Sequence, residues 1–270
     1  MEYAQSAPEN IAPQTLQEAL ALLQRRDAEL AALRHAQQEW VHAVSHDLRA
    51  PLRHVLAFNP LIAELLQLPA PSGDDLQEAI SFLQTMDQSA QRMAAMFDGL
   101  LLLSRAARQP LQWQSVDLQT LLQRIQASLQ PLQPLCEGRV IDWQLPQSCP
   151  PVQADAPLLE QALTAALSNA IKFSRHQPQA RIAVLVEDKA GEVSITISDN
   201  GVGFDGARAQ RLFGIFQRMH RESEFEGVGV GLALVQSVCQ RHGGQASIQA
   251  QPQQGCELQL RWPQLPGGQG

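Results

Sequence analysis

The chain has 270 residues, 44% of them hydrophobic, which is enough to bury the core of one large or two modest domains. With 20 basic and 27 acidic residues its formal net charge is −7, so electrostatics provide no general attraction to nucleic acid or to anionic lipid. No apolar stretch approaches the roughly 18 residues of a membrane span, and the first residues lack the basic start of a signal peptide. We therefore expect a cytoplasmic protein that neither binds nucleic acid nor inserts into a membrane.

The four cysteines predict neither a metal site nor a disulfide framework. They include no Cys-x-x-Cys pair, and no histidine lies at metal-ligand spacing from them. In a cytosolic compartment we expect all four to be reduced thiols: Cys136, Cys149, Cys239 and Cys256.

The first 109 residues read as a short arm followed by two long helices. Residues 1–14 are rich in proline and polar residues, which indicates a flexible N-terminal arm. From Leu16 apolar residues recur at alternating steps of three and four, the pattern of a coiled coil, and the pattern continues to Leu66. The Pro- and Gly-containing stretch 68–73 predicts a loop.

A second apolar stripe follows that loop and ends near Arg108, with Asp74 or Asp75 as its expected N-cap. Residues 15–109 are therefore predicted to form a helical hairpin. Its apolar face is too wide to leave in water, and a two-fold homodimer that forms a four-helix bundle covers it most simply. Packing of the hairpin on the rest of the same chain is the alternative.

Residues 110–270 predict a second domain of α+β type, because short alternating strands are set between helices. The expected strands are 113–116, 140–145, 181–187, 192–198, 246–250 and 256–262. The expected helices run from Asp117 through Leu129, from Asp155 or Ala156 to Phe173, and from Val230 to His242.

One histidine on the first helix is singled out by its position. His46 lies two residues from both Val44 and Leu48, roughly 200° around the helix from the apolar stripe, so it faces solvent. His42, Arg49 and Arg53 share that face at steps of three and four and can make it cationic. An isolated histidine there is usually an ordinary surface residue.

The neighbour of His46 changes that interpretation. The Asp47 carboxylate can hydrogen-bond one imidazole nitrogen, fix the tautomer and leave the other nitrogen nucleophilic. Pro51, five residues beyond His46, removes a backbone hydrogen bond and is expected to bend the helix.

Three later blocks predict a nucleotide site. Asn169 and Lys172 share a polar strip of one helix, offering a hard oxygen ligand for Mg²⁺ and a point charge for phosphate. Residues 199–203, Asp-Asn-Gly-Val-Gly, follow a strand directly, and residues 227–231, Gly-Val-Gly-Val-Gly, precede a helix whose N-terminus can approach a triphosphate. Taken singly, the first block is an ordinary amphipathic helix and the second an ordinary loop.

The order of the blocks resembles that of sensor histidine kinases over roughly residues 15–265, and the lid sequence is most similar to the phytochrome-associated group. The resemblance implies a dimerisation and phosphoacceptor hairpin followed by an α/β sandwich of the GHKL (Bergerat) ATPase type. It also implies that His46 is the phosphoacceptor, Asp47 its base or orienting residue, and Asn169 a ligand of Mg²⁺. It assigns ATP binding to Asn169, Lys172, Asp199, Gly201, Gly203, Arg218, Gly227, Gly229, Gly231 and Leu232.

Further roles rest on the same resemblance. Asp199 recognises adenine, and residues from about 219 to 228 form the mobile ATP lid, with Arg218 or Arg221 reaching the γ-phosphate. Phe213 and Phe216 match the phenylalanine box, although they serve equally well as core anchors. His35, His54, His176, His220 and His242 lack the setting of His46 and are interpreted as structural or surface residues.

Three positions depart from the family pattern. Ala50 replaces a polar residue associated with dephosphorylation of the response regulator, which argues against phosphatase activity. Ala165 stands where a second asparagine is common, which weakens the expected metal or phosphate coordination. Pro60 adds a second proline to the helix and can tilt or break its end.

The predicted function is a homodimeric protein histidine kinase that uses ATP and Mg²⁺ and passes the phosphoryl group from His46 to an aspartate of a separate response regulator receiver domain. Signals would enter through the coiled coil or an upstream sensor protein. Two alternatives remain: a degenerate kinase that binds nucleotide and acts as a dimeric scaffold, and an ATPase related to the topoisomerase and mismatch-repair ATP domains. Acid-labile phosphate on the protein separates the first interpretation from both.

Overall fold

The computed structural model describes residues 16–129, 140–189, 191–221 and 224–264. The chain divides into two compact units, residues 1–47 and 48–270. Helix α1 (Leu16–Leu66) begins in the first unit and ends in the second. The predicted arm at residues 1–14 and Cys136 lie outside the described residues, and Cys149, Cys239 and Cys256 are free cysteines.

The end of α1 and helix α2 (Gly73–Arg108) form the predicted hairpin. Ser72 is the N-cap of α2: its side chain accepts from the backbone N–H of Asp75, whose carboxylate accepts from the backbone N–H of Ser72 at 2.8 Å. The expectation that an aspartate is the cap was therefore wrong, because Asp75 is the N3 partner of a capping box. Pro60 does not break α1, which stays helical through Leu66.

Within the second unit, the Phe58 and Phe82 rings stack between α1 and α2 with centroids 4.9 Å apart. Many apolar side chains of this hairpin are nevertheless exposed in the single chain: Leu52, Leu56, Leu61, Leu66, Leu76, Ile80, Leu83, Phe97 and Leu101. Burying each such side chain is worth about 1.5–3 kcal/mol, so this surface favours association.

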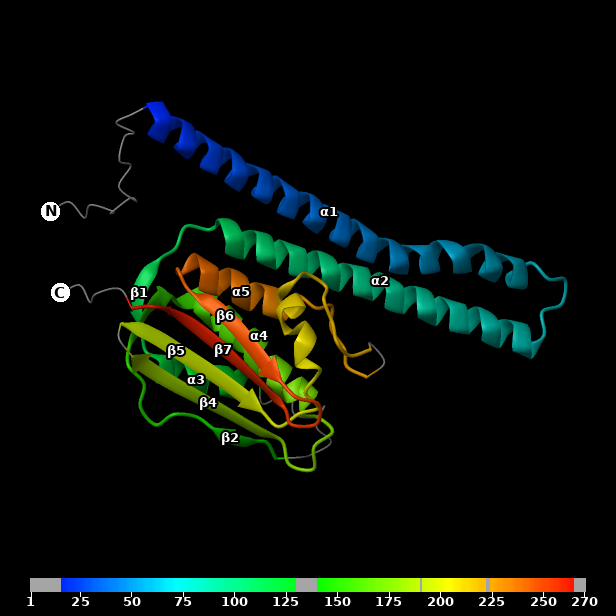
Figure 1. Cartoon of the computed structure of the whole chain (residues 1–270). Coiled ribbons are helices and arrows are strands. Elements are labelled where there is room, and N and C mark those ends of the chain that lie inside the picture. The colour runs from blue at the N-terminus through cyan, green and yellow to red at the C-terminus, as the bar shows by residue number, and fades with distance from the viewer. Residues whose placement is uncertain (1–15, 130–139, 190, 222–223, 265–270) are drawn as a thin grey trace. The chain divides into compact units, whose positions relative to one another are not determined.

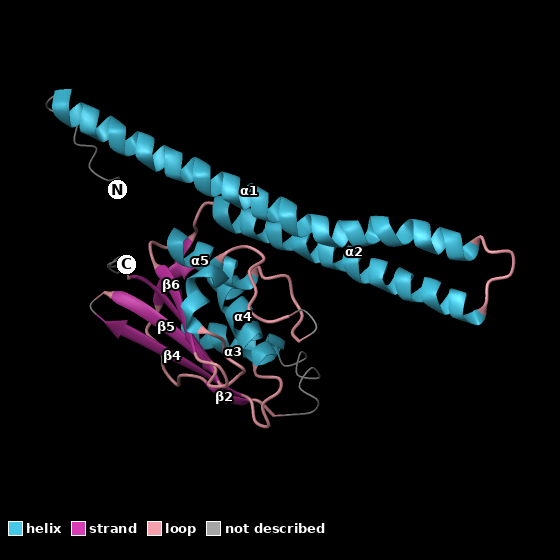
Figure 2. Ribbon diagram, turned by 45° about the vertical axis from the view of Figure 1, so that its right-hand side comes forward, coloured by secondary structure: helices cyan, strands magenta, loops and turns pink. Residues whose placement is uncertain are grey.

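The remaining elements form an α/β sandwich (Figures 1 and 2). Strands β1 (Trp113–Val116) and β3 (Val152–Asp155) form a small antiparallel pair. A five-stranded sheet has the order β2-β4-β5-β7-β6, in which β2 runs parallel to β4 and the other neighbours are antiparallel. Its strands are β2 (Asp142–Gln144), β4 (Arg181–Lys189), β5 (Glu192–Asp199), β6 (Gln245–Ala250) and β7 (Cys256–Pro263).

Helices α3 (Leu118–Leu129), α4 (Ala156–Phe173) and α5 (Gly231–Arg241) cover one face of that sheet, as both ribbon views show (Figures 1 and 2). The core lies between the layers, where Leu163 and Leu167 of α4 and Ile195, Leu260 and Trp262 of the sheet are at most 1% exposed. Every second strand residue points into this layer, which is why the alternating sequence pattern identified these strands.

Two elements were not predicted from the sequence: β3 and the 3₁₀ helix η2 (Gly206–Phe213). Strand β2 is also shorter than the predicted 140–145. In the part of the chain that the structure describes, no helix has the length and apolarity needed to cross a membrane.

Candidate functional site

His46 is displayed to solvent in the first unit. Its side chain is 72% exposed, and its Nδ1 lies 3.0 Å from Oδ1 of Asp47. With Nδ1 donating to the carboxylate, the ring is held as the tautomer whose Nε2 carries a lone pair. No hydrogen bond to Nε2 occurs within the described residues, so this nitrogen is available for a reaction with an incoming electrophile.

The cationic side chains predicted near His46 are exposed as well. His42 lies in the first unit, and Arg49 and Arg53 lie in the second. Pro51, by contrast, is buried.

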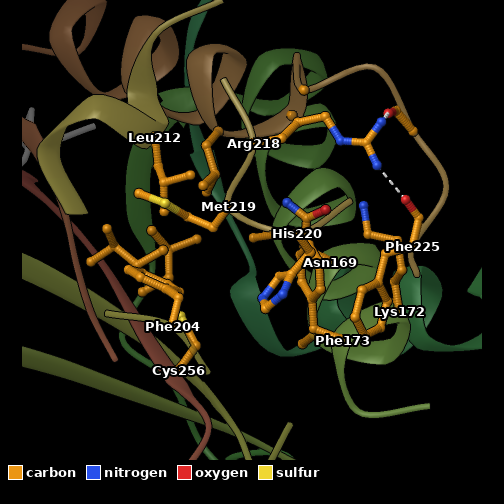
Figure 3. A pocket seen from close by; sticks show the side chains of 18 of the residues that line it. Asn169, Lys172, Phe173, Phe204, Leu212, Arg218, Met219, His220, Phe225 and Cys256 are labelled. Atoms are coloured by element: carbon orange, nitrogen blue, oxygen red, sulfur yellow. Dashed lines mark hydrogen bonds between the residues drawn. The ribbon is translucent and has the colours of Figure 1, made fainter. Parts of the chain in front are cut away.

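A pocket of about 240 Å³ in the second unit collects the predicted nucleotide-binding residues. Nine of the ten line it, from α4, the end of β5 and the segment that leads into α5: Asn169, Lys172, Asp199, Gly203, Arg218, Gly227, Gly229, Gly231 and Leu232. The tenth, Gly201, is buried and does not line the pocket, and an added Cβ there would lie 2.5 Å from the carbonyl oxygen of Phe173. Figure 3 shows Leu212, Phe204 and Cys256 toward one end, and Arg218 and Lys172 toward the other.

Asp199 supplies the polar group at the apolar end of the pocket. It ends β5, and its Oδ1 accepts a hydrogen bond of 2.8 Å from the backbone N–H of Gly201, while the backbone of Cys256 donates another. Burial nevertheless raises the pKa of its carboxyl group to about 6. A carboxylate held this way at neutral pH can accept a hydrogen bond from the amino group of a purine.

The turn after Asp199 is fixed by Asn200. Its Oδ1 accepts from the backbone N–H of Arg181 at 2.8 Å, and its Nδ2 donates to the carbonyl of Gln179 at 2.9 Å. Gly203 follows at φ +56°, and an added Cβ would lie 2.0 Å from the carbonyl oxygen of Gln251. Only glycine fits at this position.

The second glycine block is equally constrained. Gly229 has φ +78°, an added Cβ would lie 2.8 Å from the carbonyl oxygen of Gln217, and its own carbonyl accepts from the N–H of Phe216 at 2.9 Å. Phe216 itself adopts φ +60° and is only 9% exposed. The backbone of this segment is therefore held close to the pocket by contacts that a side chain would break.

Asn169 and Ala165 face the N-terminus of α5. An added Cβ on Gly231 would lie 3.4 Å from Nδ2 of Asn169 and 3.7 Å from Cβ of Ala165. The first turn of a helix has unpaired backbone N–H groups that favour anions, so the Asn169 amide lies beside a suitable phosphate site.

Lys172 reaches the same end of the pocket. Its Nζ lies 4.5 Å from the ring centre of Phe173 and 3.4 Å from the position that a Cβ on Gly227 would take. Burial lowers the pKa of Lys172, as do the charges of Arg218 and Arg175, while Glu226 opposes the shift. The negative charge of an incoming phosphate would favour the ammonium form and raise this pKa again.

The donor set suits Mg²⁺ bound together with phosphates. Asn169 offers an amide oxygen and Ala165 offers no ligand. Among the described residues, no group of three or more His, Cys, Asp or Glu side chains is arranged to hold a metal ion. Mg²⁺ commonly takes only one or two protein ligands and completes its shell with water and substrate phosphates, so Asn169 fits such a site.

Arg218 bonds to the lid backbone. Its Nη1 donates to the carbonyl of Gly227 at 2.6 Å and its Nη2 to the carbonyl of Phe225. Burial lowers the pKa of Arg218, Arg92 lowers it further, and Glu226 opposes this. Arg221, the alternative phosphate contact, has an exposed side chain and does not line the pocket.

Sequence reasoning missed the apolar lining, which comes from Phe204, Leu212, Met219, Ile248, Cys256 and Leu258. The predicted lid, about residues 219–228, included His220, but this residue was interpreted as structural or surface. Its Nε2 lies 3.0 Å from the carbonyl oxygen of Gly203, and its ring lies 5.5 Å from that of Phe173. His220 is part of the pocket wall. No local pattern indicated this, because its partners are distant in the sequence.

Two family profiles match the chain. Residues 36–109 match the His Kinase A (phospho-acceptor) domain, and residues 154–266 match the histidine kinase-, DNA gyrase B-, and HSP90-like ATPase. The alginate biosynthesis sensor protein KinB from Pseudomonas aeruginosa is 31% identical over 90% of this chain and 40% of its own length. Five of the curated relatives, two of them phytochrome or phytochrome-like proteins, are longer: this chain spans 25% to 50% of their length.

Two solved structures share the fold. Full-length ShkA in complex with AMPPNP is 23% identical, with a TM-score of 0.56 over 85% of this chain and 46% of its own. The histidine kinase ThkA in complex with the response regulator protein TrrA is 16% identical, with a TM-score of 0.62 over 94% of this chain and 69% of its own. The α+β architecture of hairpin followed by ATPase-type sandwich is thereby confirmed.

Proposed function

Since the chain belongs to the sensor histidine kinase family, as a catalytic core with a phosphoacceptor hairpin and an ATP-binding domain, we propose that it uses ATP to phosphorylate its own His46. One observation carries the proposal. One pocket combines the partly buried carboxylate of Asp199 with a cationic, glycine-lined end, in a chain that also displays a histidine hydrogen-bonded to its neighbouring carboxylate. The first group of residues holds a nucleoside triphosphate, and the second accepts its terminal phosphoryl group.

In the proposed reaction the Nε2 lone pair of His46 attacks the γ-phosphorus, while the bond between that phosphorus and the bridging oxygen breaks and ADP leaves. The imidazole then carries a positive charge, which Asp47 stabilises through Nδ1–H until that proton is released to solvent. The attack needs an exposed, correctly protonated nitrogen, which the 3.0 Å contact and the 72% exposure of His46 supply.

The pocket residues contribute positioning and charge neutralisation instead of covalent chemistry. Asp199 accepts a hydrogen bond from the adenine amino group, Lys172 and the N-terminus of α5 attract the phosphates, and Asn169 would be the protein ligand of Mg²⁺. When bound, Mg²⁺ neutralises charge that develops on the phosphate oxygens. The family resemblance also assigned Arg218 to the γ-phosphate, a role that we retain as part of the proposal.

The phosphoryl group of His46 is then passed to an aspartate of a separate response regulator. ThkA was solved in complex with such a protein, TrrA, which supports this partner class for a chain of the same fold. We also propose a homodimer, because the exposed leucines, Ile80 and Phe97 of the hairpin need a cover and a second copy offers a matching surface.

The test is labelling with γ-³²P-ATP and Mg²⁺. We expect label that is lost in acid, survives in base, and disappears in the His46→Gln and Asn169→Ala variants. His35→Gln is the matched control: it removes another histidine of α1, 73% exposed and about three turns from His46, and should leave labelling unchanged.

Ala165 favours one other function, a dimeric scaffold that binds nucleotide without phosphorylating itself, because it offers no ligand beside Gly231. ATP binding with normal affinity but no label on the wild-type chain would support the scaffold and overturn the kinase proposal.

A further inference from the structure

Arg175 stands just beyond the end of α4 and belongs to none of the predicted motifs, yet it is partly buried, with its side chain only 21% exposed. Its Nη1 donates to Oε2 of Glu226 at 2.7 Å, and its Nε donates to Nε2 of His176 at 3.2 Å. Its guanidinium carbon also lies 4.5 Å from the ring centre of Phe225. One arginine thus contacts two consecutive residues of the lid, Phe225 and Glu226.

Phe225 is the apolar half of this contact. It is only 4% exposed, and its ring lies 5.0 Å from that of Phe173, 5.5 Å from that of His176 and 5.2 Å from that of His220. Phe173 and His176 lie at and after the end of α4, as Arg175 does. A lid residue is therefore enclosed by the segment that follows Asn169 and Lys172, and the cation over its ring adds a favourable contact.

The dipeptide held in this way borders the phosphate end of the pocket. Phe225, Glu226 and Gly227 all line it, and the carbonyls of Phe225 and Gly227 accept from Arg218. Gly227 also lies against the Lys172 amine. Any shift of Phe225 and Glu226 would consequently displace Arg218, Gly227 and the surroundings of Lys172 together.

The negative charge of Glu226 could either weaken or strengthen the binding of ATP. As a carboxylate in the pocket wall it repels phosphate, but as the partner of Arg175 it fixes the lid. Exposed ion pairs contribute little by themselves, and the Glu226 side chain is 56% exposed. The same arginine, however, is also packed on a buried ring, so the pair is one part of a larger contact.

We propose that Arg175 is a positioning residue for the triphosphate of ATP: by holding Phe225 and Glu226 it keeps Lys172, Arg218 and Gly227 in the arrangement that receives phosphate. This deepens the proposed function and rests on it. We call these contacts of Arg175 with Phe225 and Glu226 the Arg175 clamp. It acts on the phosphate half of the site, because the hydrogen bonds that hold the Asp199 carboxylate come from Gly201 and Cys256 and not from the clamp.

The test measures ATP and AMP binding by titration calorimetry in a His46→Gln background, so that no phosphoryl transfer interferes. Arg175→Gln should weaken ATP binding about tenfold, the range expected when a cation–π contact and a charge-assisted hydrogen bond are lost, and should change AMP binding less than twofold. Arg175→Lys keeps the charge and should recover part of the loss. Glu226→Gln should also weaken ATP, and the double variant should be no weaker than Arg175→Gln.

Arg124→Gln is the matched control, because Arg124 makes a 2.7 Å ion pair with Glu160 and neither residue lines the pocket. It should bind ATP and AMP normally. The proposed role of Arg175 would be contradicted by tighter ATP binding in Glu226→Gln. It would also be contradicted by equal losses of affinity for ATP and AMP in Arg175→Gln.

The Asp199→Asn variant distinguishes a failure of the proposed role of Arg175 from a failure of the proposed ATP site. If that variant loses both nucleotides while Arg175→Gln binds both normally, only the clamp is wrong. If Asp199→Asn binds both nucleotides normally, the pocket is not the ATP site and the proposed function fails with it.

Discussion

The segment that carries His46 and the domain that carries the pocket display their functional groups in opposite ways. His46 needs one neighbour, Asp47, and high exposure. The pocket needs a half-buried carboxylate, two residues of α4 and several glycines from segments far apart in the sequence. The proposed phosphoryl acceptor has to be reachable by ATP and later by a receiver domain, whereas a bound nucleotide has to be enclosed.

This difference predicts how the two regions respond to substitution. Changing His46 should remove the reaction and leave stability intact, because its side chain makes a single exposed hydrogen bond. Changes in the pocket should affect binding, and some of them should affect the fold too.

Asp199→Asn should weaken ATP binding about 10- to 100-fold, because a charged acceptor in a partly buried site contributes about 1.5–3 kcal/mol. Titration calorimetry measures this, with Asp188→Asn, which alters an exposed aspartate of β4, as the control. Affinity within twofold of the wild type would mean that adenine is recognised elsewhere.

Lowering the pH should mimic that variant. The pKa of Asp199 is raised to about 6, so its carboxylate is ionised above that value and protonated below it. We expect ATP affinity to be constant above about pH 7 and to fall about tenfold per unit well below pH 6, since each unit then removes about nine-tenths of the ionised form. The Asp199→Asn variant should not show this fall in ATP affinity below pH 6. If it does, a group other than Asp199 causes the pH dependence.

Gly229→Ala should destabilise the ATP-binding domain by about 1–3 kcal/mol and weaken ATP binding, because its positive φ and the nearby Gln217 carbonyl leave no space for a Cβ. Gly191→Ala is a close control: its φ is +80°, but an added Cβ meets nothing within 4 Å. Thermal unfolding of both variants separates backbone strain from the steric clash. Equal losses of stability in the two variants would show that the Gln217 carbonyl near Gly229 has no effect.

Ala165→Asn is expected to have the smallest effect. The new amide would lie beside Gly231 and Asn169 and add a second oxygen ligand, so we predict about a two- to threefold lower Mg²⁺ requirement for ATP binding. A titration of Mg²⁺ at fixed ATP checks this. A higher requirement would show that an asparagine is too large beside the N-terminus of α5.

Local signals predicted much of the fold. Helix α4 begins after Asp155, whose side chain accepts from the N–H of Leu158, and the helices and strands with regular periodicity lie close to where the sequence placed them. Strand β3 was missed because it follows Pro150 and Pro151 and is defined by pairing with β1, about 40 residues earlier. The 3₁₀ helix η2 is only eight residues long, which is too short for its periodicity to identify a helix from the sequence.

The glycine blocks identified the polar part of the pocket from the sequence. Positions with positive φ or with a close backbone neighbour require glycine, so they leave a local pattern. His220 and Arg175 could not be found in this way. Their roles depend on contacts with Phe173, Gly203 and the lid, which only the folded chain brings together. The proposed domain boundaries at residues 14 and 109 stay predictions.

The most direct test of the account is to map the phosphate by mass spectrometry at neutral to basic pH after incubation with ATP and Mg²⁺. We predict a gain of one phosphoryl mass, located on His46 in peptides that contain residues 41–55, and a gain that is about 10- to 100-fold slower in the Asp199→Asn variant at subsaturating ATP. A phosphoryl group on another residue, or an unmodified His46 in a chain that binds ATP normally, would contradict the assignment of His46 as the acceptor.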